Sequence, residues 1–182
     1  MPVDWEGAKE ALRTVTGAPS EFKQIFATLQ LMITEDPRVA RPTFAVLDEF
    51  EAAAAPSARL YDGTTSLLAR LSESAKVSLV TMQGRAACSI VLERFGLKQY
   101  FLECFTREDS LDRAEQLEFA LSSMRAARSS SMFVGDRLND LKASKKVGVP
   151  FTMIRTHGDD PEGEEDVPVY HSIAEFLAAV ES

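Results

Sequence analysis

The chain has 182 residues, of which 45% are apolar and 26% are charged, and its formal net charge is −8. This composition is typical of a soluble globular protein with one domain, or with a core and a modest insertion. The negative charge argues against a nucleic-acid surface, and no apolar run approaches the roughly 18 residues that a membrane-spanning helix requires.

The first third of the chain is predicted to be helical throughout. Asp4 can cap a first helix, in which apolar residues recur at three- and four-residue intervals. A second apolar stripe of helical period covers residues 22–33 and is broken at Asp36, which precedes a proline. A third helix is predicted over residues 44–55. We expect no strand before about residue 75, which makes this an all-helical block.

Short apolar strands are predicted to alternate with helices over the remainder of the chain. The candidate strands cover residues 77–80, 100–105, 131–134, 151–154 and 167–170. The helices among and after them include residues 114–127, 138–147 and 173–180. Such alternation implies a parallel sheet that is covered on both faces, with its chemistry at the carboxyl ends of the strands. The acidic stretch 158–166 is expected to be a solvated loop.

The strongest local motif is an acidic pair after the third candidate strand. That strand ends at Gly135, Asp136 follows where the chain turns into a helix, and Asp140 lies four residues later. The spacing puts both carboxylates on one side of the first helical turn. Two carboxylates at the carboxyl end of a strand make a site for Mg²⁺, which is a hard cation. The alternative is a helix N-terminus that carries acids to suit its dipole.

Two further positions suit a phosphoryl group. Thr81 ends the first candidate strand, and Met82 and Gln83 follow it at a helix start. A hydroxyl and free backbone N–H groups can hold phosphate there, although Thr81 can also be a simple helix cap. Arg113 opens a later helix and is either a permanent cation for phosphate or an ordinary surface arginine.

The order and spacing of these residues resemble the haloacid dehalogenase (HAD) superfamily of phosphoryl-transfer enzymes. In that family a hydroxyl residue ends the second strand, a lysine or arginine opens a later helix, and an acidic pair follows a Gly-Asp turn. Thr81, Arg113, Asp136 and Asp140 match these positions one by one. The helical block resembles the small cap of phosphoglycolate-phosphatase-like members, so the resemblance covers essentially the whole chain.

The family's first motif, a strand that ends in Asp-X-Asp-Gly-Thr, is not found in this sequence. Its first aspartate is the family's nucleophile and its second is the general acid and base, so that an aspartyl-phosphate forms and is then hydrolysed. Asp4 belongs to the first helix, and Asp48 falls in a helical pattern and is expected to face solvent. Asp62 and the residues after it imitate the motif, but no apolar strand precedes them.

The absence of this motif has a structural consequence. In the family the first strand is central, between the strands that end at Thr81 and Gly135. Without it, these two strands either keep unpaired backbone groups, which are costly when buried, or pair directly with each other. Truncation, a misplaced start and genuine loss of the strand all remain open.

The combined prediction is an α/β protein with a Rossmann-like HAD core. The core is expected over residues 56–182, with a mostly parallel sheet, and a helical cap over residues 1–55. The resemblance implies Mg²⁺-dependent hydrolysis of a small phosphomonoester. The isolated Cys88 and Cys104 favour the cytoplasm. The charge and the lack of a long apolar run favour no nucleic-acid or membrane partner, while a protein partner or a homo-oligomer stays open.

The resemblance also assigns roles to the site residues. They are Asp136 and Asp140 for Mg²⁺, Thr81, Met82 and Gln83 for the phosphoryl oxygens, and Arg113 for phosphate and for the charge of the intermediate. Without the nucleophile the chain is expected to be nearly inert. The competing hypothesis is a pseudoenzyme that binds Mg²⁺, phosphate or a protein partner without turnover.

Overall fold

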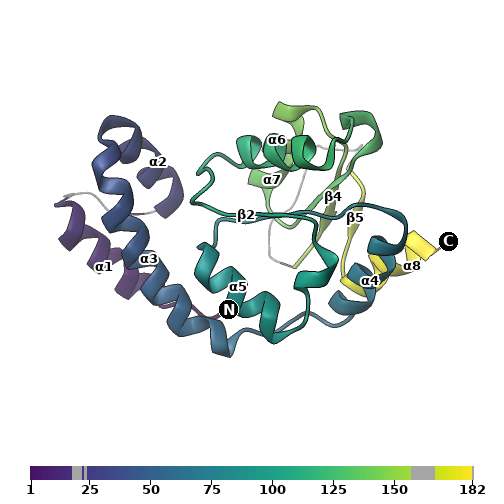
Figure 1. Ribbon diagram of the computed structural model, residues 1–182, viewed down its shortest axis with the longest axis horizontal. Helices are drawn as coiled ribbons and strands as arrows, with labels where there is room; N and C mark the ends of the chain where they lie inside the picture. Colours follow the sequence, from purple (N-terminus) through teal and green to yellow (C-terminus); the bar gives the residue numbers. More distant parts are fainter. Residues whose placement is uncertain (18–21, 23, 157–166, 182) are drawn as a thin grey trace. The chain divides into compact units, whose positions relative to one another are not determined.

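The computed structural model describes residues 1–17, 22, 24–156 and 167–181 (Figure 1). Its α-helices are α1 Trp5–Thr16, α2 Ile25–Glu35, α3 Ala40–Ala54, α4 Thr64–Ser74, α5 Arg85–Arg94, α6 Arg113–Met124, α7 Leu138–Val147 and α8 Ile173–Glu181. Its strands are β1 Leu79–Val80, β2 Cys104–Phe105, β3 Phe133–Gly135, β4 Phe151–Ile154 and β5 Val169–Tyr170. Short 3-10 turns are η1 Pro37–Val39, η2 Ala55–Ser57, η3 Lys98–Tyr100 and η4 Arg128–Ser130. Within the described residues, no helix is both long enough and apolar enough to cross a membrane.

The chain folds into two compact units, each made of segments that are separated in the sequence. The first unit consists of Met1–Arg59, Thr81–Lys98 and Thr106–Asp112. The second consists of Leu60–Val80, Gln99–Phe105 and Arg113–Ser182. The predicted division into a cap over residues 1–55 and a core over residues 56–182 stays a prediction.

The first unit is built on α3, which packs against α1 and α5. Asp4 caps α1 as predicted, because its Oδ1 accepts a hydrogen bond of 2.9 Å from the Gly7 N–H. Gly17 ends α1 with a φ of 65°, in the left-handed region that glycine adopts without strain. Leu12 of α1 and Leu47 of α3 are fully buried in the core of this unit.

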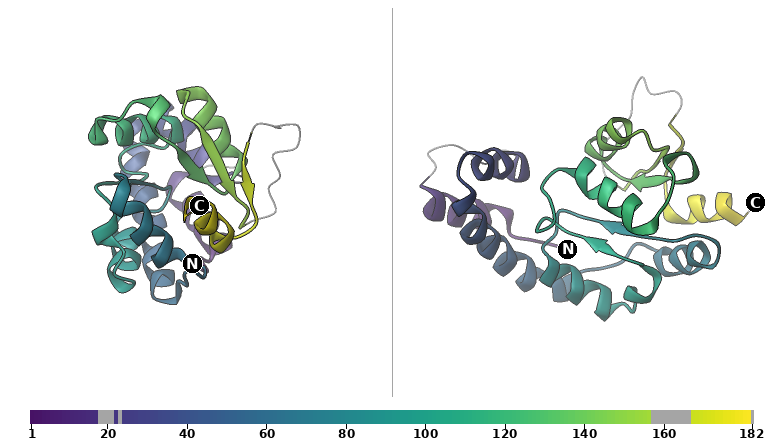
Figure 2. Two further views of the ribbon diagram at one scale, coloured as in Figure 1. Left: turned by 90° about the vertical axis from the view of Figure 1, so that its right-hand side faces the viewer. Right: turned by 45° about the horizontal axis from the view of Figure 1, so that its top comes forward.

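The second unit contains a parallel sheet of β3, β4 and β5 with helices on both faces. Phe133, Phe151 and Met153 share a core with residues of α6 and α7. The alternate residues Val134 and Ile154 pack into a second core with residues of α4 and α8. Figures 1 and 2 show these two pairs of helices on opposite sides of the strands. This is the architecture that short apolar strands between helices predict.

A separate parallel sheet of β1 and β2 belongs to the same unit. Val80 of β1 pairs with Phe105 and packs against the core that contains Phe133 of β3. Nevertheless, β1 and β3 are not hydrogen-bonded neighbours among the described strands. Of the two outcomes predicted for the strands that end at Thr81 and Gly135, the structure has the one without direct pairing.

The predicted helices and parallel strands are present, but several are shorter than the sequence pattern indicates. The candidate strand 100–105 is reduced to the two residues of β2 and is preceded by the turn η3. Helix α6 ends at Met124 because Arg125 adopts a φ of 52° and the Ala126 N–H bonds back to the Leu121 carbonyl at 3.0 Å. The acidic stretch 158–166 lies outside the described residues.

Candidate active site

The predicted acidic pair lies at the carboxyl end of β3. Asp136 follows the strand directly, and Asp140 lies in the first turn of α7 and is buried, with an exposure of 7%. Backbone N–H groups of Asp136 and Arg137 bond to the Asp140 carboxyl group. A Cβ atom at Gly135 would lie only 2.7 Å from Cβ of Asp140. Glycine at the end of β3 therefore leaves the space that the Asp140 side chain occupies.

Arg113 contacts this acidic pair from the start of α6. Its Nε lies 3.1 Å from Oδ1 of Asp140, and its Nη1 donates a hydrogen bond of 2.9 Å to the side chain of Gln116. Burial raises the pKa of Asp140, against the charge of Arg113, and burial lowers the pKa of Arg113, against the charges of the two aspartates. The structure thus brings three of the predicted site residues together, and the Arg113 side chain, only 20% exposed, is not an ordinary surface arginine.

Asp136 is hydrogen-bonded to Thr156, a residue that the sequence pattern did not indicate. Thr156, two residues beyond the end of β4, donates a hydrogen bond of 2.8 Å from its hydroxyl to Oδ2 of Asp136. Because β3 and β4 are parallel neighbours, their carboxyl ends meet at one edge of the sheet, which makes a threonine in that position a detectable signal. The arrangement offers two carboxylates, one guanidinium and one hydroxyl at that edge.

The donor set suits a magnesium ion that stays open to substrate. Among the described residues no group of three or more histidine, cysteine, aspartate or glutamate side chains could hold a metal. Mg²⁺, however, is often bound by one or two carboxylates, with water and phosphate oxygens in its other positions. Asp136 and Asp140 fit that pattern and do not fit an enclosed, all-protein cage.

Of the predicted phosphate residues, Thr81, Met82 and Gln83 belong to the first unit, in the loop over residues 81–84 that connects β1 to α5. The Gln83 N–H donates a hydrogen bond of 3.1 Å to Oγ1 of Thr81. The Met82 carbonyl accepts one of 3.2 Å from Nη1 of Arg107. Thr81, Met82 and Gln83 are thus together in one unit, and Arg113, Asp136 and Asp140 are together in the other.

Two backbone donors at the start of α5 are taken by carboxylates of the protein itself. The Gly84 N–H donates to Oε2 of Glu51 at 2.7 Å, and the Arg85 N–H donates to Oε1 of Glu108 at 3.1 Å. The sequence predicts free amides at this helix start, and these two are not free. Carboxylates at a helix N-terminus satisfy its unpaired donors and suit its dipole.

A buried arginine is the centre of this first-unit network. The Arg107 side chain is fully buried, and it pairs with Glu51, at 2.7 Å, and with Asp48. Asp48 does lie in a helix, α3, but its side chain is 38% exposed and bound to Arg107, so it does not simply face solvent as predicted. The sequence pattern missed Glu51 and Arg107, because their partners are more than 20 positions away along the chain.

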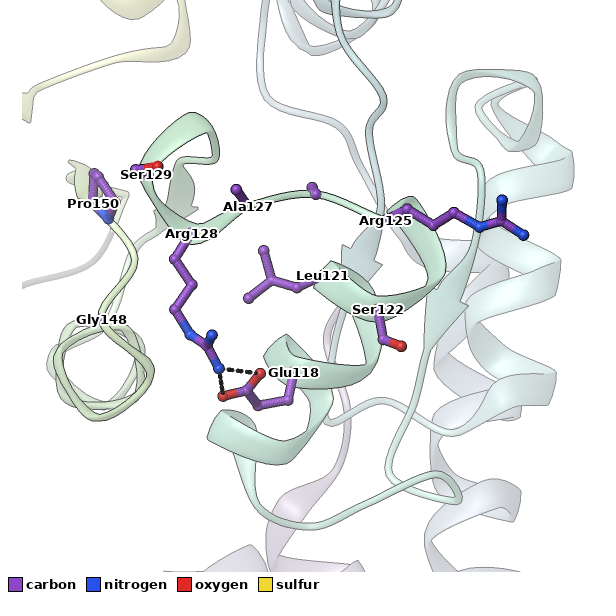
Figure 3. Close-up of a pocket in the computed structure, with 10 residues that line it drawn as sticks. Glu118, Leu121, Ser122, Arg125, Ala127, Arg128, Ser129, Gly148 and Pro150 are labelled. Carbon is purple, nitrogen blue, oxygen red and sulfur yellow. Dashed lines mark hydrogen bonds and ion pairs between the residues drawn. The ribbon is translucent and has the colours of Figure 1, made fainter.

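A shallow hollow of about 720 Å³ lies elsewhere in the second unit (Figure 3). Residues 125–129, before β3, and Gly148 and Pro150, before β4, form part of its lining. At this hollow Arg128 Nη2 bonds to both carboxylate oxygens of Glu118, at 2.6 and 2.9 Å. It borders the amino ends of the strands, whereas Asp136 follows a carboxyl end, so the hollow is distinct from the acidic pair.

Comparison with known families gives a match over most of the chain. The sequence pattern of haloacid dehalogenase-like hydrolases matches residues 8–154. The chain belongs to this family. The match covers parts of both units and all six predicted site residues. Sequence comparison with curated proteins gave no match.

Solved structures of several hydrolases share the fold. A hydrolase from Pseudomonas syringae superposes with a TM-score of 0.73 and 16% identity, over 96% of this chain and 89% of that chain. A haloacid dehalogenase-like hydrolase from Streptococcus pneumoniae gives 0.68 and 17%, over 96% and 89%. A protein described as a putative phosphoglycolate phosphatase, from Lactobacillus plantarum, gives 0.64 and 20%, over 95% and 90%. At these identities the likeness shows the fold alone.

Proposed function

We propose that the protein is a HAD-type phosphatase that acts on small phosphomonoesters with the help of Mg²⁺. The observation that supports this best is the set of side chains at the carboxyl end of β3, where Asp136, Asp140 and Arg113 lie together in a chain that belongs to the HAD hydrolases. Hard oxygen donors beside a permanent cation suit a phosphoryl group and a divalent ion better than they suit an apolar or cationic ligand.

Each residue then has a stated role. Asp136 and Asp140 hold the metal, which supplies positive charge to the phosphoryl oxygens when bound. Thr81 donates its hydroxyl to a phosphoryl oxygen, with Met82 and Gln83 beside it. Arg113 neutralises charge that develops during the reaction, because a guanidinium keeps its proton at neutral pH. Thr156 keeps the Asp136 carboxylate oriented through its hydroxyl bond.

We also propose that turnover by this chain is slow. Among the described strands, only β3 is followed directly by an aspartate, Asp136, which is assigned to the metal. Asp4 caps α1, and Asp62 is exposed in the turn before α4, so neither occupies the position of a strand-end nucleophile. Loss of a covalent nucleophile can lower the rate on the order of a millionfold.

A non-catalytic role is the second candidate. It is favoured by the lack of a strand-end nucleophile among the described residues and by the carboxylates that already occupy the Gly84 and Arg85 amides. In that case the acidic pair binds Mg²⁺ or phosphate, or the surface binds a protein partner, without hydrolysis. In either role we place the protein in the reducing cytoplasm, since two isolated cysteines without metal-ligand spacing, Cys88 and Cys104, suit that compartment.

Hydrolysis of a generic chromogenic phosphomonoester by this chain separates the two candidates. The assay is run with Mg²⁺, with a chelator, and with the variant Asp136→Asn. Asp62→Asn is the matched control, because it makes the same change at an exposed aspartate outside the site. Turnover that requires both Mg²⁺ and Asp136 supports the phosphatase. Folded protein that binds Mg²⁺ but gives no turnover supports the non-catalytic role.

A further inference from the structure

The loop over residues 81–84 packs on a buried charge cluster that is supplied by two separate segments of the first unit. Asp48 and Glu51 lie on α3, and Arg107 lies in the segment after β2. One oxygen of Glu51, Oε2, accepts both from the Gly84 N–H and from Arg107 Nη1, each at 2.7 Å. The same Nη1 also donates to the Met82 carbonyl at 3.2 Å. The cluster therefore bonds to the backbone of the loop at two points.

The cluster fits too tightly around the loop to be an incidental contact. A Cβ atom at Gly84 would collide with Oδ1 of Asp48 and with Nη2 of Arg107. Side chains of Glu51 and Arg107 are 1% and 0% exposed, so water does not share their bonds. Glycine at position 84 allows the backbone to approach the charges this closely.

Stability alone is a poor reason for this arrangement. Removing two charges from water can cost more than their attraction returns, and a well-packed apolar group is often at least as stable. Two buried atoms of the cluster, Oε1 of Glu51 and Nε of Arg107, have no hydrogen-bond partner in the described structure, which adds to the cost. Burial also raises the pKa of Glu51, against the charge of Arg107. Besides the ion pairs within the cluster, Glu51 and Arg107 also bond to the backbone of the loop, at Gly84 and Met82.

We propose that Glu51 and Arg107 are positioning residues that set the backbone of the 81–84 loop for phosphate. In this arrangement α3 acts on the loop through the bond between Glu51 and the Gly84 N–H, and Arg107 holds the Met82 carbonyl. The proposal rests on the proposed function, because it assigns the loop to phosphate. Glu51 and Arg107 do not contact phosphate themselves in this proposal, because neither side chain reaches solvent. They act on it by holding the loop.

The test compares Glu51→Ala with Glu51→Gln, which retains an oxygen that can accept from the Gly84 N–H. Glu49→Gln is the matched control, since Glu49 lies on the same helix and is exposed. Amide hydrogen exchange of Gly84 and binding of inorganic phosphate with MgCl₂ are followed by NMR in ¹⁵N-labelled chain. We expect Glu51→Ala to speed Gly84 exchange and to weaken phosphate binding about tenfold or more, because a bond to a charged group is lost. Glu51→Gln should recover most of both effects, and Glu49→Gln should change neither.

Unchanged Gly84 exchange and phosphate affinity in folded Glu51→Ala would overturn the proposal while the proposed function stands. If the wild-type chain neither binds phosphate nor turns over substrate, the proposed function fails. In that case, fast exchange of the Gly84 amide in the wild type would separately contradict the role of Glu51 in holding the loop. If Glu51→Ala does not fold, the wild-type chain decides: the Gly84 amide shift should follow protonation of Glu51, and this response should vanish in Glu51→Gln. If the chemical shift of the Gly84 amide does not change when Glu51 is protonated, the proposal is contradicted.

Discussion

Each of the two units contains a cluster of one arginine and two carboxylates, but the two clusters make different contacts. In the first unit Arg107 is fully buried, and it and Glu51 bond to backbone atoms of the 81–84 loop. In the second unit Arg113 keeps some exposure and meets the carboxylate of Asp140 at the end of a strand. The first cluster thus bonds to the backbone of a loop, whereas the second leaves carboxylate oxygens at the edge of the sheet. Placement, more than composition, distinguishes a structural cluster from a candidate site.

The largest predicted effect is the loss of Arg107. Replacing it by methionine leaves the Glu51 carboxylate buried without its guanidinium, and we expect the free energy of unfolding to fall by about 3–5 kcal/mol. Arg113→Met should cost less, because water can reach its 20%-exposed side chain and the site around it. Urea unfolding of both variants measures the difference. Equal losses in the free energy of unfolding would contradict the distinction between a buried cluster around Arg107 and a partly exposed one around Arg113.

A methyl group placed in either cluster should separate metal binding from loop packing. Gly135→Ala pushes against Asp140, so we expect Mg²⁺ affinity to fall about tenfold or more by titration calorimetry. Gly84→Ala pushes against Asp48 and Arg107, and it should lower stability while Mg²⁺ affinity stays at the wild-type value. A metal affinity that responds equally to both changes would contradict the assignment of Mg²⁺ to the second cluster.

The pH dependence of stability should have the same sign in both clusters. Burial raises the pKa of Glu51 and of Asp140 in the folded chain. Their stabilising contribution is therefore complete below the ordinary carboxyl range, near pH 4, and is lost as pH rises through the raised folded values. Urea unfolding between about pH 4 and 7 should show a shallower fall in Asp140→Asn and in Glu51→Gln than in the wild type. A steeper fall in either variant would mean that pairing outweighs burial.

The smallest effect is expected at the hollow at the amino ends of β3 and β4. Arg128 and Glu118 form an ion pair with side chains that are 53% and 45% exposed. Water screens such pairs, so Arg128→Met should change the free energy of unfolding by less than about 1 kcal/mol. It should leave Mg²⁺ binding unaltered. A loss comparable with that of Arg107→Met would show that exposure does not separate these arginines as argued.

The sequence predicted the helices and the order of the strands because both depend on local patterns. Asp4 and Gly17 mark the ends of α1, and α7 and β4 have the predicted bounds. The strands β1 and β2 proved shorter than their apolar runs, since an apolar run shows burial and does not show where backbone pairing stops.

The acidic pair was predictable for the same reason, whereas the partners around it were not. Asp136 and Asp140 are four residues apart, so a local pattern contains both. Thr156 and Glu51 act on residues that are 20 and 33 positions away, and single-sequence periodicity does not report such distances. Two glycines, at 84 and 135, were the available signals, because each precedes a helix at a point where backbone and carboxylate approach closely.

The unpaired edges of β1 and β3 also bear on how the chain behaves at high concentration. Each strand has a hydrogen-bonded neighbour on one side only among the described strands. An open edge is a template for another extended chain, and long, flat edges lead to aggregation. Here the edges without a strand neighbour are two residues long in β1 and three in β3. Such short edges offer an incoming strand few backbone bonds, so their brevity limits self-association through the sheet.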